Sequence, residues 1–324
     1  MGMIPALVRR VVGAALLVGA SACAFLSLAA QGGRFSERLD LLTHFAPMYL
    51  GGGALALACL MFLPRGGARS GAAVAAGVAI LSSLALMAPE ALRRPPPAVT
   101  ADTPLQLRII QLNSWGLNDP DPRATARWLK EQKPDVVMVE ELEPNLVDAI
   151  VRETGWRYTR GMLRTGIFTR ADPAGSPFRL GKPWDDWPGL ARTSIRFGGE
   201  TIPLVAVHLT WPTDPVQARQ RHQIGLLKGR TDPRRMIMLG DFNLTPWSFA
   251  LQRLDRDLGM IRRDRALWSW PARAHGRAPH GPLAPWLPID HVYAGSAWKT
   301  VSVTRGPRLA SDHFPVIVVL ALED

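Results

Sequence analysis

The chain contains little cysteine: Cys23 and Cys59 are the two cysteines among its 324 residues, and both lie in apolar segments. The part beyond residue 100 has none, which excludes disulfide bonds there, so cysteine usage does not report the compartment. The sequence also lacks a cluster of cysteine and histidine of the kind that holds structural zinc. A glycine-rich phosphate loop of the nucleotide-binding type is missing as well, and we expect no bound nucleotide cofactor.

Charge is almost absent from the first hundred residues. Uncharged runs extend over residues 11–33, 41–64 and 70–89, and each is long enough for the roughly 20 residues that span a bilayer core. The runs are rich in alanine and glycine, whose small side chains allow helices to pack closely in lipid. We predict that residues 1–92 form a transmembrane segment with helices at about 11–30, 45–63 and 71–89.

The basic residues that flank these runs give a weak bias in orientation. Two arginines precede the first run and two lie between the second and third, whereas the two between the first and second are balanced by carboxylates. Two arginines after the third run oppose the bias. The residues are Arg9, Arg10, Arg34, Glu37, Arg38, Asp40, Arg65, Arg69, Arg93 and Arg94. We expect a multi-pass protein of the cytoplasmic (inner) membrane, with the N-terminus inside and the following domain on the extracytoplasmic side.

A competing interpretation treats Ala20-Ser21-Ala22-Cys23 as a lipoprotein cleavage site that would leave Cys23 lipidated. The apolar run continues past Cys23, which argues against cleavage. Cleavage there would still leave two spans and the same location for the domain that follows.

Residues 93–104 read RRPPPAVTADTP and form a proline-rich linker. Three consecutive prolines favour an extended, stiff connection. We therefore expect the following domain to stay near the lipid surface.

Residues 105–324 have the pattern of an α/β domain. Short apolar strands alternate with amphipathic helices, strands outnumber helices, and several neighbouring strands look antiparallel, which favours a sandwich over a doubly wound parallel sheet. Helices are expected from Pro122 (capped by Asp121) and from Pro144, over residues 214–228 and from Thr245-Pro246. The predicted strands are 105–112, 136–139, 166–169, 194–197, 202–207, 236–239, 289–294, 299–304 and 316–320.

Polar side chains gather at the ends of these strands. They are Asn113, Glu140, Glu141, His208, Asp241, Asn243, Asp290, Asp312 and His313. Carboxylates, amides and histidines that converge from several strand ends are what metal-assisted hydrolysis of phosphate esters needs. Of the formal net charge of +11, residues 1–100 carry +5 and the remaining residues carry 11 − 5 = +6. This mild excess of positive charge suits anionic partners.

Glu141 is the main candidate metal ligand, because a carboxylate that ends an apolar strand needs a cation or another partner. Oxygen ligands suit Mg²⁺ or Mn²⁺. The alternative is that Glu140 or Glu141 caps the helix that starts at Pro144.

Asp241 can orient and deprotonate water, and Asn243 can hold a phosphoryl oxygen; both share one side-chain parity if the strand continues through them. The alternative is an Asx-turn that leads into the next helix. His208 and His313 can protonate a leaving oxygen, and Asp290 can orient one of them.

The sequence resembles the endonuclease/exonuclease/phosphatase superfamily. Six segments occur in the order found there and extend over about residues 105–321: IIQLNSWGLN, PDVVMVEEL, VAVHLTWP, MLGDFNLTPWS, LPIDHVY and ASDHFPV. Each is weak alone, but six in order are highly specific. The resemblance implies an α/β fold, a four-layer α/β sandwich of two mixed sheets flanked by helices, here preceded by the transmembrane segment.

The resemblance also implies roles for matching residues. A divalent metal, Mg²⁺ or Mn²⁺, would be bound by Asn113 and Glu141, with Asp312 at the metal or in support. The residues that would activate water and hold or protonate the phosphoryl group are His208, Asp241, Asn243, Asp290 and His313.

Two positions depart from the superfamily's pattern. Trp115 stands where the DNA-repair members carry an aspartate, which weakens the interpretation as an abasic-site nuclease. Glu140-Glu141 replaces the usual Gln-Glu, which leaves two glutamates to choose from, and Glu141 is taken as the ligand.

Three spans before a catalytic domain look like the membrane-bound branch that includes vancomycin/teicoplanin-resistance proteins. That branch is associated with prenyl-pyrophosphate hydrolysis at the outer face of the membrane. The expected function is therefore phosphoesterase action on a membrane lipid phosphate such as a polyprenyl pyrophosphate. Candidate substrate-binding residues are Trp211, Arg273 and Arg277.

The aromatic and cationic segment 268–288 suits a membrane interface, but it also suits a stacking platform for nucleic acid. A surface-tethered, metal-dependent nuclease acting on DNA is thus an alternative function, although the modest charge and the absence of groove-reading motifs give it little support. A catalytically silent binding module would lack catalytic residues, whereas every expected polar position is filled.

Overall fold

The computed structural model describes residues 6–62, 65–116, 121–176, 187–273 and 284–323. The chain divides into two compact units. The first comprises Met1–Arg93 together with Thr245–Gln252, and the second comprises Arg94–Leu244 together with Arg253–Asp324.

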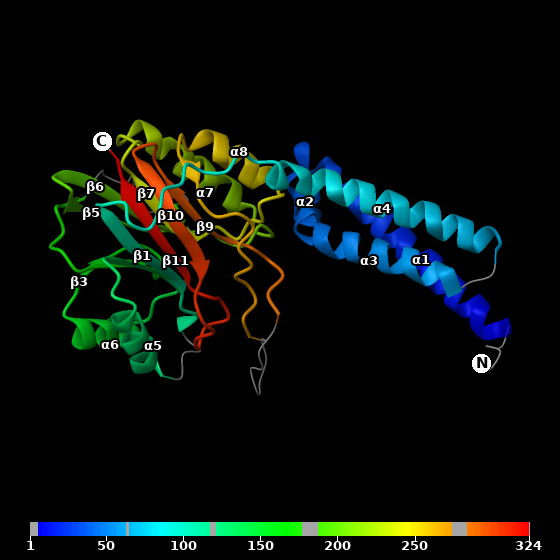
Figure 1. Ribbon diagram of the computed structural model, residues 1–324, viewed down its shortest axis with the longest axis horizontal. Coiled ribbons are helices and arrows are strands. Elements are labelled where there is room, and N and C mark those ends of the chain that lie inside the picture. The colour runs from blue at the N-terminus through cyan, green and yellow to red at the C-terminus, as the bar shows by residue number, and fades with distance from the viewer. Residues whose placement is uncertain (1–5, 63–64, 117–120, 177–186, 274–283, 324) are drawn as a thin grey trace. The chain divides into compact units, whose positions relative to one another are not determined.

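The first unit is built on three helices that lie side by side: α1 (Ala6–Ala30), α3 (Ala46–Cys59) and α4 (Gly67–Ala91) (Figure 1). Short turns of helix connect them, namely η1 (Gln31–Arg34), α2 (Glu37–Asp40), η2 (Leu41–Phe45) and η3 (Leu60–Phe62). Three segments, Val8–Arg34, Glu37–Cys59 and Gly67–Ala91, are long and apolar enough to cross a membrane. This confirms the prediction of three such helices, although α3 ends four residues before position 63 and continues only as the 3₁₀ turn η3.

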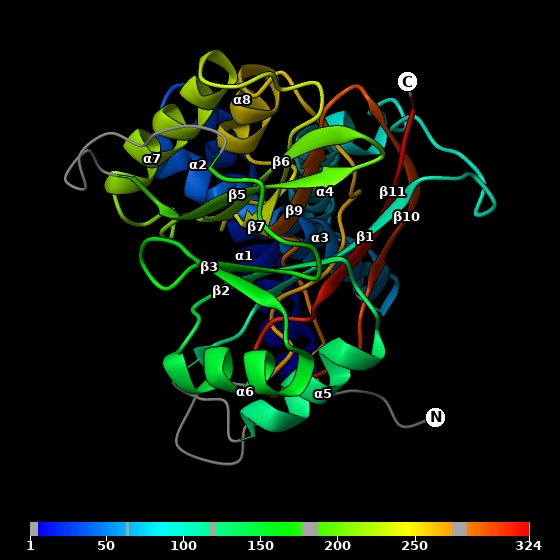
Figure 2. The same ribbon diagram turned by 90° about the vertical axis from the view of Figure 1, so that its left-hand side faces the viewer.

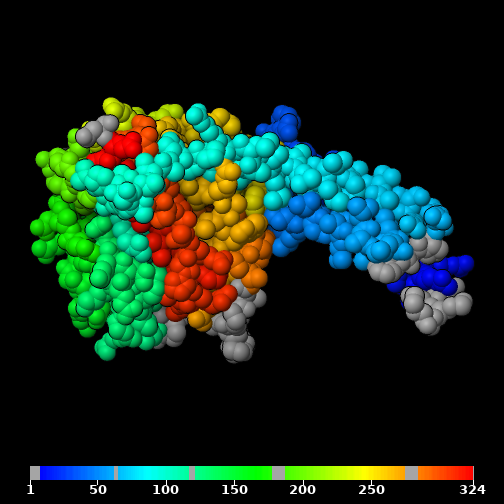
Figure 3. Space-filling model, viewed as in Figure 1, coloured from blue at the N-terminus to red at the C-terminus, as the bar shows by residue number. Residues whose placement is uncertain are grey.

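Small residues let these helices approach closely, as expected for packing in lipid. Ala20, Ala56 and Ala76 form a shared apolar contact. A side chain at Gly53 of α3 would come within 3.1 Å of the Ala76 carbonyl oxygen of α4. The space-filling view shows α3 and α4 in continuous contact (Figure 3).

The first unit also contains the start of helix α8 (Phe249–Asp257). The prediction that this helix begins at Thr245-Pro246 was wrong, because residues 245–248 form a turn in which the Ser248 amide bonds the Thr245 carbonyl at 3.0 Å. The first amides of α8 donate instead to Asp40, from Phe249 at 2.9 Å and from Ala250 at 2.8 Å. A carboxylate from a distant part of the chain therefore caps this helix.

The second unit contains two mixed sheets (Figures 1 and 2). The first sheet has the order β10-β11-β1-β2-β4-β3, with β1 (Gln106–Asn113), β2 (Val136–Glu140), β3 (Arg157–Arg160), β4 (Gly166–Thr169), β10 (Trp298–Arg305) and β11 (Val316–Leu322). The second has the order β5-β6-β7-β9-β8, with β5 (Gly189–Phe197), β6 (Glu200–His208), β7 (Ile237–Asp241), β8 (Ile261–Arg262) and β9 (Asp290–Ala294). The β1–β2 and β6–β7 pairs are parallel and the other pairs are antiparallel.

Helices cover the outer faces of both sheets, so the predicted α/β architecture of two mixed sheets flanked by helices is confirmed. Helices α5 (Pro122–Glu131) and α6 (Pro144–Thr154) pack on the first sheet through an apolar cluster that includes Ile110, Val137 and Leu129. Figure 2 shows α7 (Val216–Gly225) on the side of the second sheet, opposite α5 and α6. Asp121 caps α5 as predicted, accepting bonds from the amides of Arg123 and Ala124 at 3.1 Å each.

Sequence patterns missed or shortened several strands. β3 has the polar sequence RYTR and pairs only with β4 at a sheet edge, and β8 has two residues. β5 begins five residues earlier than predicted because Gly189 pairs with His208 of β6. The helix predicted over 214–228 is α7 followed by the 3₁₀ turn η5 (Leu226–Gly229).

The linker is already bonded to the second unit at residues 97–99, before the linker ends at residue 104. Ala98 forms a bridge with Thr300 of β10. The Thr300 amide donates to the Pro97 carbonyl at 2.8 Å, and the Val99 amide donates to the Thr300 carbonyl at 3.0 Å. The free connection from the end of α4 at Ala91 to Pro97 is therefore short.

Candidate active site

Side-chain alternation directs the polar strand ends into the space between the sheets. On β1, Leu107 and Ile109 belong to the core between the sheets, and Gln111 and Asn113 continue the same parity. The alternation is repeated on the other central strands, where apolar core residues are followed by Glu140 on β2, His208 on β6 and Asp241 on β7.

The strand registers bring these ends to one edge. Asn113 lies opposite Glu140, and Asp241 lies between His208 and Asp290. Because β9 runs antiparallel to β7, the first residue of β9 meets the last residue of β7. The structure thus assembles the predicted polar residues from both sheets.

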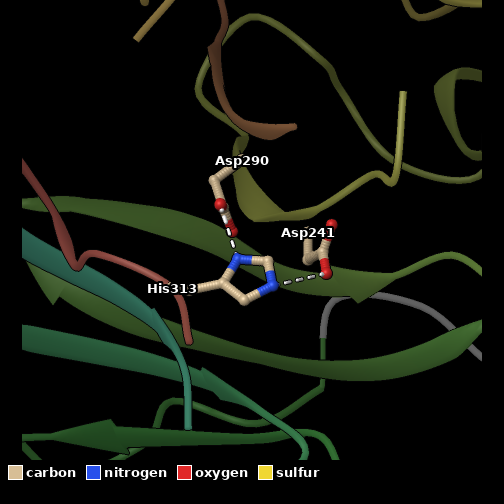
Figure 4. Close-up of side chains that lie close together, drawn as sticks. All are labelled: Asp241, Asp290 and His313. Carbon is tan, nitrogen blue, oxygen red and sulfur yellow. Dashed lines mark hydrogen bonds and ion pairs between the residues drawn. The ribbon is translucent and has the colours of Figure 1, made fainter. Parts of the chain in front are cut away.

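His313 lies between two carboxylates (Figure 4). Its Nδ1 donates to Asp290 Oδ2 at 2.8 Å, and its Nε2 lies 3.6 Å from Asp241 Oδ2. Burial alone would lower the pKa of His313, but Asp290 and Asp241 outweigh it and raise the pKa to about 10. The two carboxylates therefore favour the imidazolium form of the ring, and Asp290 holds its Nδ1.

Asp241 is the acceptor at the centre of the group. Burial raises its pKa to about 8, against the attraction of His313. Its Oδ1 accepts a hydrogen bond from the Asn243 amide at 2.9 Å, so the Asx-turn that was the alternative interpretation is present. This turn holds the Asp241 carboxylate in position and is compatible with a catalytic role for it.

Asn243 does not continue the strand. β7 ends at Asp241, and Asn243 has a φ of 51°, so the predicted shared parity was wrong. The side-chain nitrogen donates to the Leu209 carbonyl at 2.8 Å. The buried amide oxygen has no partner within the described protein and is the atom left to accept a hydrogen bond from water or substrate.

His208 and Glu141 form the more accessible side of the site. His208 Nε2 lies 3.7 Å from Asp241 Oδ2 and 3.9 Å from Glu141 Oε1. Burial lowers the pKa of His208, although Glu141 opposes this. The Glu141 side chain is 32% exposed, and its φ of 52° lies in the left-handed region, which is costly for a glutamate. The chain turns out of β2 at this point and directs the carboxylate toward Asn113.

Gln111 was missed as a site residue, and Glu140 was passed over in favour of Glu141 as the metal ligand. Gln111 Nε2 donates to Glu140 Oε2 and to Asp290 Oδ1, both at 2.8 Å. Glu140 is fully buried, and this burial raises its pKa well above the usual range. The parity of Leu107, Ile109 and Asn113 could have indicated Gln111, because these positions alternate along one strand.

The donor set fits a hard divalent cation at the Glu141 side of the site. Asn113 Nδ2 lies 3.2 Å from Glu141 Oε1 and 3.1 Å from Asp241 Oδ2, so two carboxylates converge on one electropositive group. Carboxylate oxygens are the ligands that Mg²⁺ and Mn²⁺ prefer. As oriented here, Asn113 directs its nitrogen to the carboxylates and its oxygen to the Trp115 amide at 3.1 Å, so ligation by Asn113 requires the amide to turn over.

Among the described residues, Asp241, Asp290 and His313 also bring ligand atoms within 4.8 Å of one another, which makes them a different candidate group for an ion. Both nitrogens of His313 already face carboxylates, so the imidazolium itself neutralises this group. We therefore favour Glu141, beside Asp241, as the place for an ion.

Asp312 contacts the aromatic rim. Its Oδ2 accepts the Trp270 indole N–H at 2.9 Å. Trp270 packs edge-on against Trp211 and Trp286, with ring centroids 5.6 and 5.7 Å away. This places Asp312 in a supporting position rather than among the carboxylates around Asn113.

The other substrate-binding candidates differ in position. Trp211 is 48% exposed at the rim. Arg273 is half-buried and donates through Nε to the Leu309 carbonyl at 2.9 Å. Arg277 lies outside the described residues.

Known structures share this architecture. TDP2 of D. rerio, humanised by 14 mutations, is 19% identical, with 66% of this chain and 98% of that chain covered and a TM-score of 0.51. A functionally unknown conserved protein of Enterococcus faecalis is 14% identical (67% and 100% covered, TM-score 0.52). A mannosyl-6-phosphatase of Bacteroides thetaiotaomicron is also 14% identical (67% and 100% covered, TM-score 0.51). At these identities the likeness concerns the fold.

No curated protein matches the chain closely. Residues 110–313, however, match the sequence model of the Endonuclease/Exonuclease/phosphatase family. This match covers more than half of the chain and includes every polar strand end described above. The protein therefore belongs to the Endonuclease/Exonuclease/phosphatase family, whose members are hydrolases that act on phosphoester bonds.

Proposed function

We propose that the protein is a membrane-anchored, divalent-metal-dependent phosphoesterase that hydrolyses a phosphate ester or pyrophosphate of a membrane lipid, such as a polyprenyl pyrophosphate. In this proposal it belongs with the membrane-bound branch that resembles vancomycin/teicoplanin-resistance proteins. It is a multi-pass protein of the cytoplasmic membrane, and its catalytic unit acts on the extracytoplasmic side.

The observation that carries the proposal is the cavity beside the catalytic residues. It has a volume of about 350 Å³ and is lined by Glu141, Leu163, Arg164, Gly189, His208, Leu209 and Thr210. Leu163 is 63% exposed. A guanidinium and an exposed leucine next to the catalytic carboxylates suit a substrate with both a phosphate and a hydrocarbon part.

The length of the connection supports a substrate in the membrane. Ala91 ends the third potential span, and Pro97 is already bonded to β10. Six residues extend at most about 20 Å. In this proposal the short connection keeps lipid phosphates within reach of the catalytic unit, which makes them more accessible to it than a dilute solute.

The chemistry follows from the arrangement of the side chains. Glu141, beside Asp241, would hold Mg²⁺ or Mn²⁺, which supplies charge neutralisation for the phosphoryl oxygens when bound. Asp241 takes a proton from the attacking water as the new O–P bond forms and the P–O bond to the leaving group breaks, and the leaving oxygen takes a proton from His313 or His208. The His313 imidazolium, oriented by Asp290, donates through Nε2 toward the phosphoryl group, and His208 faces the same space from β6.

The test uses the full chain in nanodiscs of zwitterionic lipid with Mg²⁺ or Mn²⁺. Phosphate release is measured from a polyprenyl pyrophosphate and from a phospholipid, and cleavage is measured on single- and double-stranded DNA. We expect turnover of a lipid phosphate, lost in Asp241→Ala and His313→Ala. Efficient cleavage of DNA without phosphate release from either lipid would overturn the proposal.

That outcome would favour the alternative, a surface-tethered metal-dependent nuclease. The edge-on cluster of Trp211, Trp270 and Trp286 is the feature that suits it, because exposed aromatic rings can stack on bases. Trp211→Ala separates the two functions. It should weaken DNA binding in the nuclease, whereas in the lipid phosphoesterase it should affect only the embedded substrate.

A further inference from the structure

The first unit contains a basic cavity that the catalytic chemistry does not use. It has a volume of about 650 Å³ and lies where α1 and α4 begin. Its described lining consists of four arginines and small or apolar residues: Arg9, Arg10, Gly13, Ala14, Leu17, Arg65, Gly66, Gly67, Ala68 and Arg69.

Acidic residues are missing from this end of the helices. The sequence has no aspartate or glutamate in residues 1–36 or 41–89. The nearest carboxylates along the chain are Glu37 and Asp40, after α1 ends, and Glu90, near the end of α4, where it pairs with Arg93 at 3.0 Å. The helices that form the cavity therefore bring four positive charges together and supply no carboxylate there.

The chemistry of the lining selects a phosphate. Guanidinium groups present planar pairs of N–H donors that match phosphate oxygens. Basic pockets between membrane helices are known to hold anionic lipid headgroups. The cavity is thus complementary in charge to a phosphorylated ligand.

The size and the walls of the cavity select a ligand larger than inorganic phosphate. A volume of about 650 Å³ is that of a pocket for a molecule with many heavy atoms. A side chain placed at Gly66 or Gly67 would meet nothing within 4 Å, so the glycines leave this space open. Leu17 and Ala14 provide an apolar wall on α1, which suits the glycerol and first acyl carbons of a lipid.

We propose that this cavity binds the headgroup of an anionic phospholipid, with the phosphate among the four arginines and the acyl chains along α1. The ligand links the starts of α1 and α4 and places this end of the unit at an anionic leaflet. Where that leaflet faces the cytoplasm, as is usual, the N-terminus is inside. The proposal is independent of the substrate of the catalytic unit.

The test measures lipid retention by native mass spectrometry of the full chain, released from nanodiscs of phosphatidylcholine with a minority of phosphatidylglycerol. Arg9→Gln with Arg69→Gln removes two charges of the cavity. Each arginine near a membrane contributes about fivefold in affinity, so the loss expected for the pair is about 25-fold. Gly67→Leu keeps all four arginines, fills the open space and should also reduce retention.

The matched control is Arg38→Gln with Arg94→Gln, which removes two exposed charges outside the cavity. It should retain phosphatidylglycerol as the wild type does. Equal loss in this control would show general attraction to an anionic surface, and full retention in Gly67→Leu would show that the cavity is not the site; either result overturns the proposal. Displacement of the lipid by inorganic phosphate would overturn it as well, because the ligand would then be a small anion. Arg10→Gln with Arg65→Gln serves as the second pair if the first fails to fold by circular dichroism.

Discussion

Replacing Asp290 by asparagine tests whether Asp290 holds the buried His313 ring as an imidazolium that acts in catalysis. Asp290 accepts from His313 Nδ1 through one oxygen and from Gln111 Nε2 through the other, both at 2.8 Å. Asparagine has one acceptor and one donor end. Its oxygen can accept from His313 or from Gln111, but at the other contact two N–H donors then face each other.

The magnitude follows from the charge of the ring. The pKa of His313 rises from 6.5 to about 10, which corresponds to roughly 5 kcal/mol in favour of the imidazolium. Asp290, at 2.8 Å and hydrogen-bonded, supplies a larger share than Asp241 at 3.6 Å. With about 3 kcal/mol lost and the ring no longer fixed, we expect Asp290→Asn to lower kcat by about 10²- to 10⁴-fold.

The chain offers a matched control beside the second sheet. Asp264 is also fully buried and accepts from a histidine, His291 Nδ1, at 2.9 Å, and from the Val292 amide at 2.8 Å. Asp264→Asn should destabilise the protein by about 3 kcal/mol or more, because a buried charged partnership is broken, and should leave kcat of the folded protein unchanged.

The assay compares kcat and KM on the best lipid phosphate substrate with the urea midpoint of each variant. Asp290→Asn should lose turnover while still folded, at a urea midpoint lowered about as far as that of Asp264→Asn, because both changes break a buried carboxylate–histidine pair. If Asp290→Asn kept more than about a tenth of wild-type kcat, or if Asp264→Asn lost turnover to the same extent while folded, the assignment of His313 would be wrong.

Three further outcomes are expected. Glu141→Gln should raise the concentration of Mg²⁺ or Mn²⁺ needed for activity by about tenfold or more. The control is Glu143→Gln, which removes a carboxylate that pairs with Arg164 and should leave this concentration unchanged. Titration of activity with the metal measures both variants. Burial alone would raise the pKa of Asp264, but His291 and the other partners hold that pKa below its usual range. The ionised carboxylate therefore contributes stability above about pH 4, and this contribution is lost as the pH falls through the pKa of the folded state. The urea midpoints of wild type and Asp264→Asn should converge only below about pH 4. Trp211→Ala should lower turnover of a lipid in nanodiscs more than turnover of a soluble short-chain analogue, and equal losses would exclude a membrane-contact role.

The convergence of the site could be predicted from the sequence because strand ends carry their own signal. An apolar run with period-two burial fixes where a strand stops, and the next polar residue stands at the sheet edge. Asp241 and His208 were located in this way, and the register places them side by side. Gln111 was missed because a glutamine within a strand reads as one more alternating position.

The choice between Glu140 and Glu141 depended on information that the local sequence does not carry. Parity directs Glu140 into the core, where it bonds Gln111. Glu141 reaches Asn113 because the backbone turns to a positive φ directly after β2. Both glutamates therefore belong to the site, in different environments.

Contacts between distant segments account for the remaining differences. The start of α8 was misplaced because its first amides bond Asp40, about two hundred residues earlier in the chain. The indole of Trp270 bonds Asp312 across a similarly unpredictable contact between loops. Periodicity and capping rules are local, so they cannot supply these partners.

The position of the metal can be separated from the function of the buried histidine. His313 neutralises Asp241 and Asp290 from within, whereas the partly exposed Glu141 faces the site from the other side of Asp241. If an ion binds beside Glu141, then Glu141→Gln should weaken metal binding and Asp290→Asn should leave it unchanged, as measured by Mn²⁺ titration followed by electron paramagnetic resonance. An equal loss of Mn²⁺ affinity in both variants would place the ion among Asp241, Asp290 and His313 instead, and His313 would then be a neutral ligand rather than an acid.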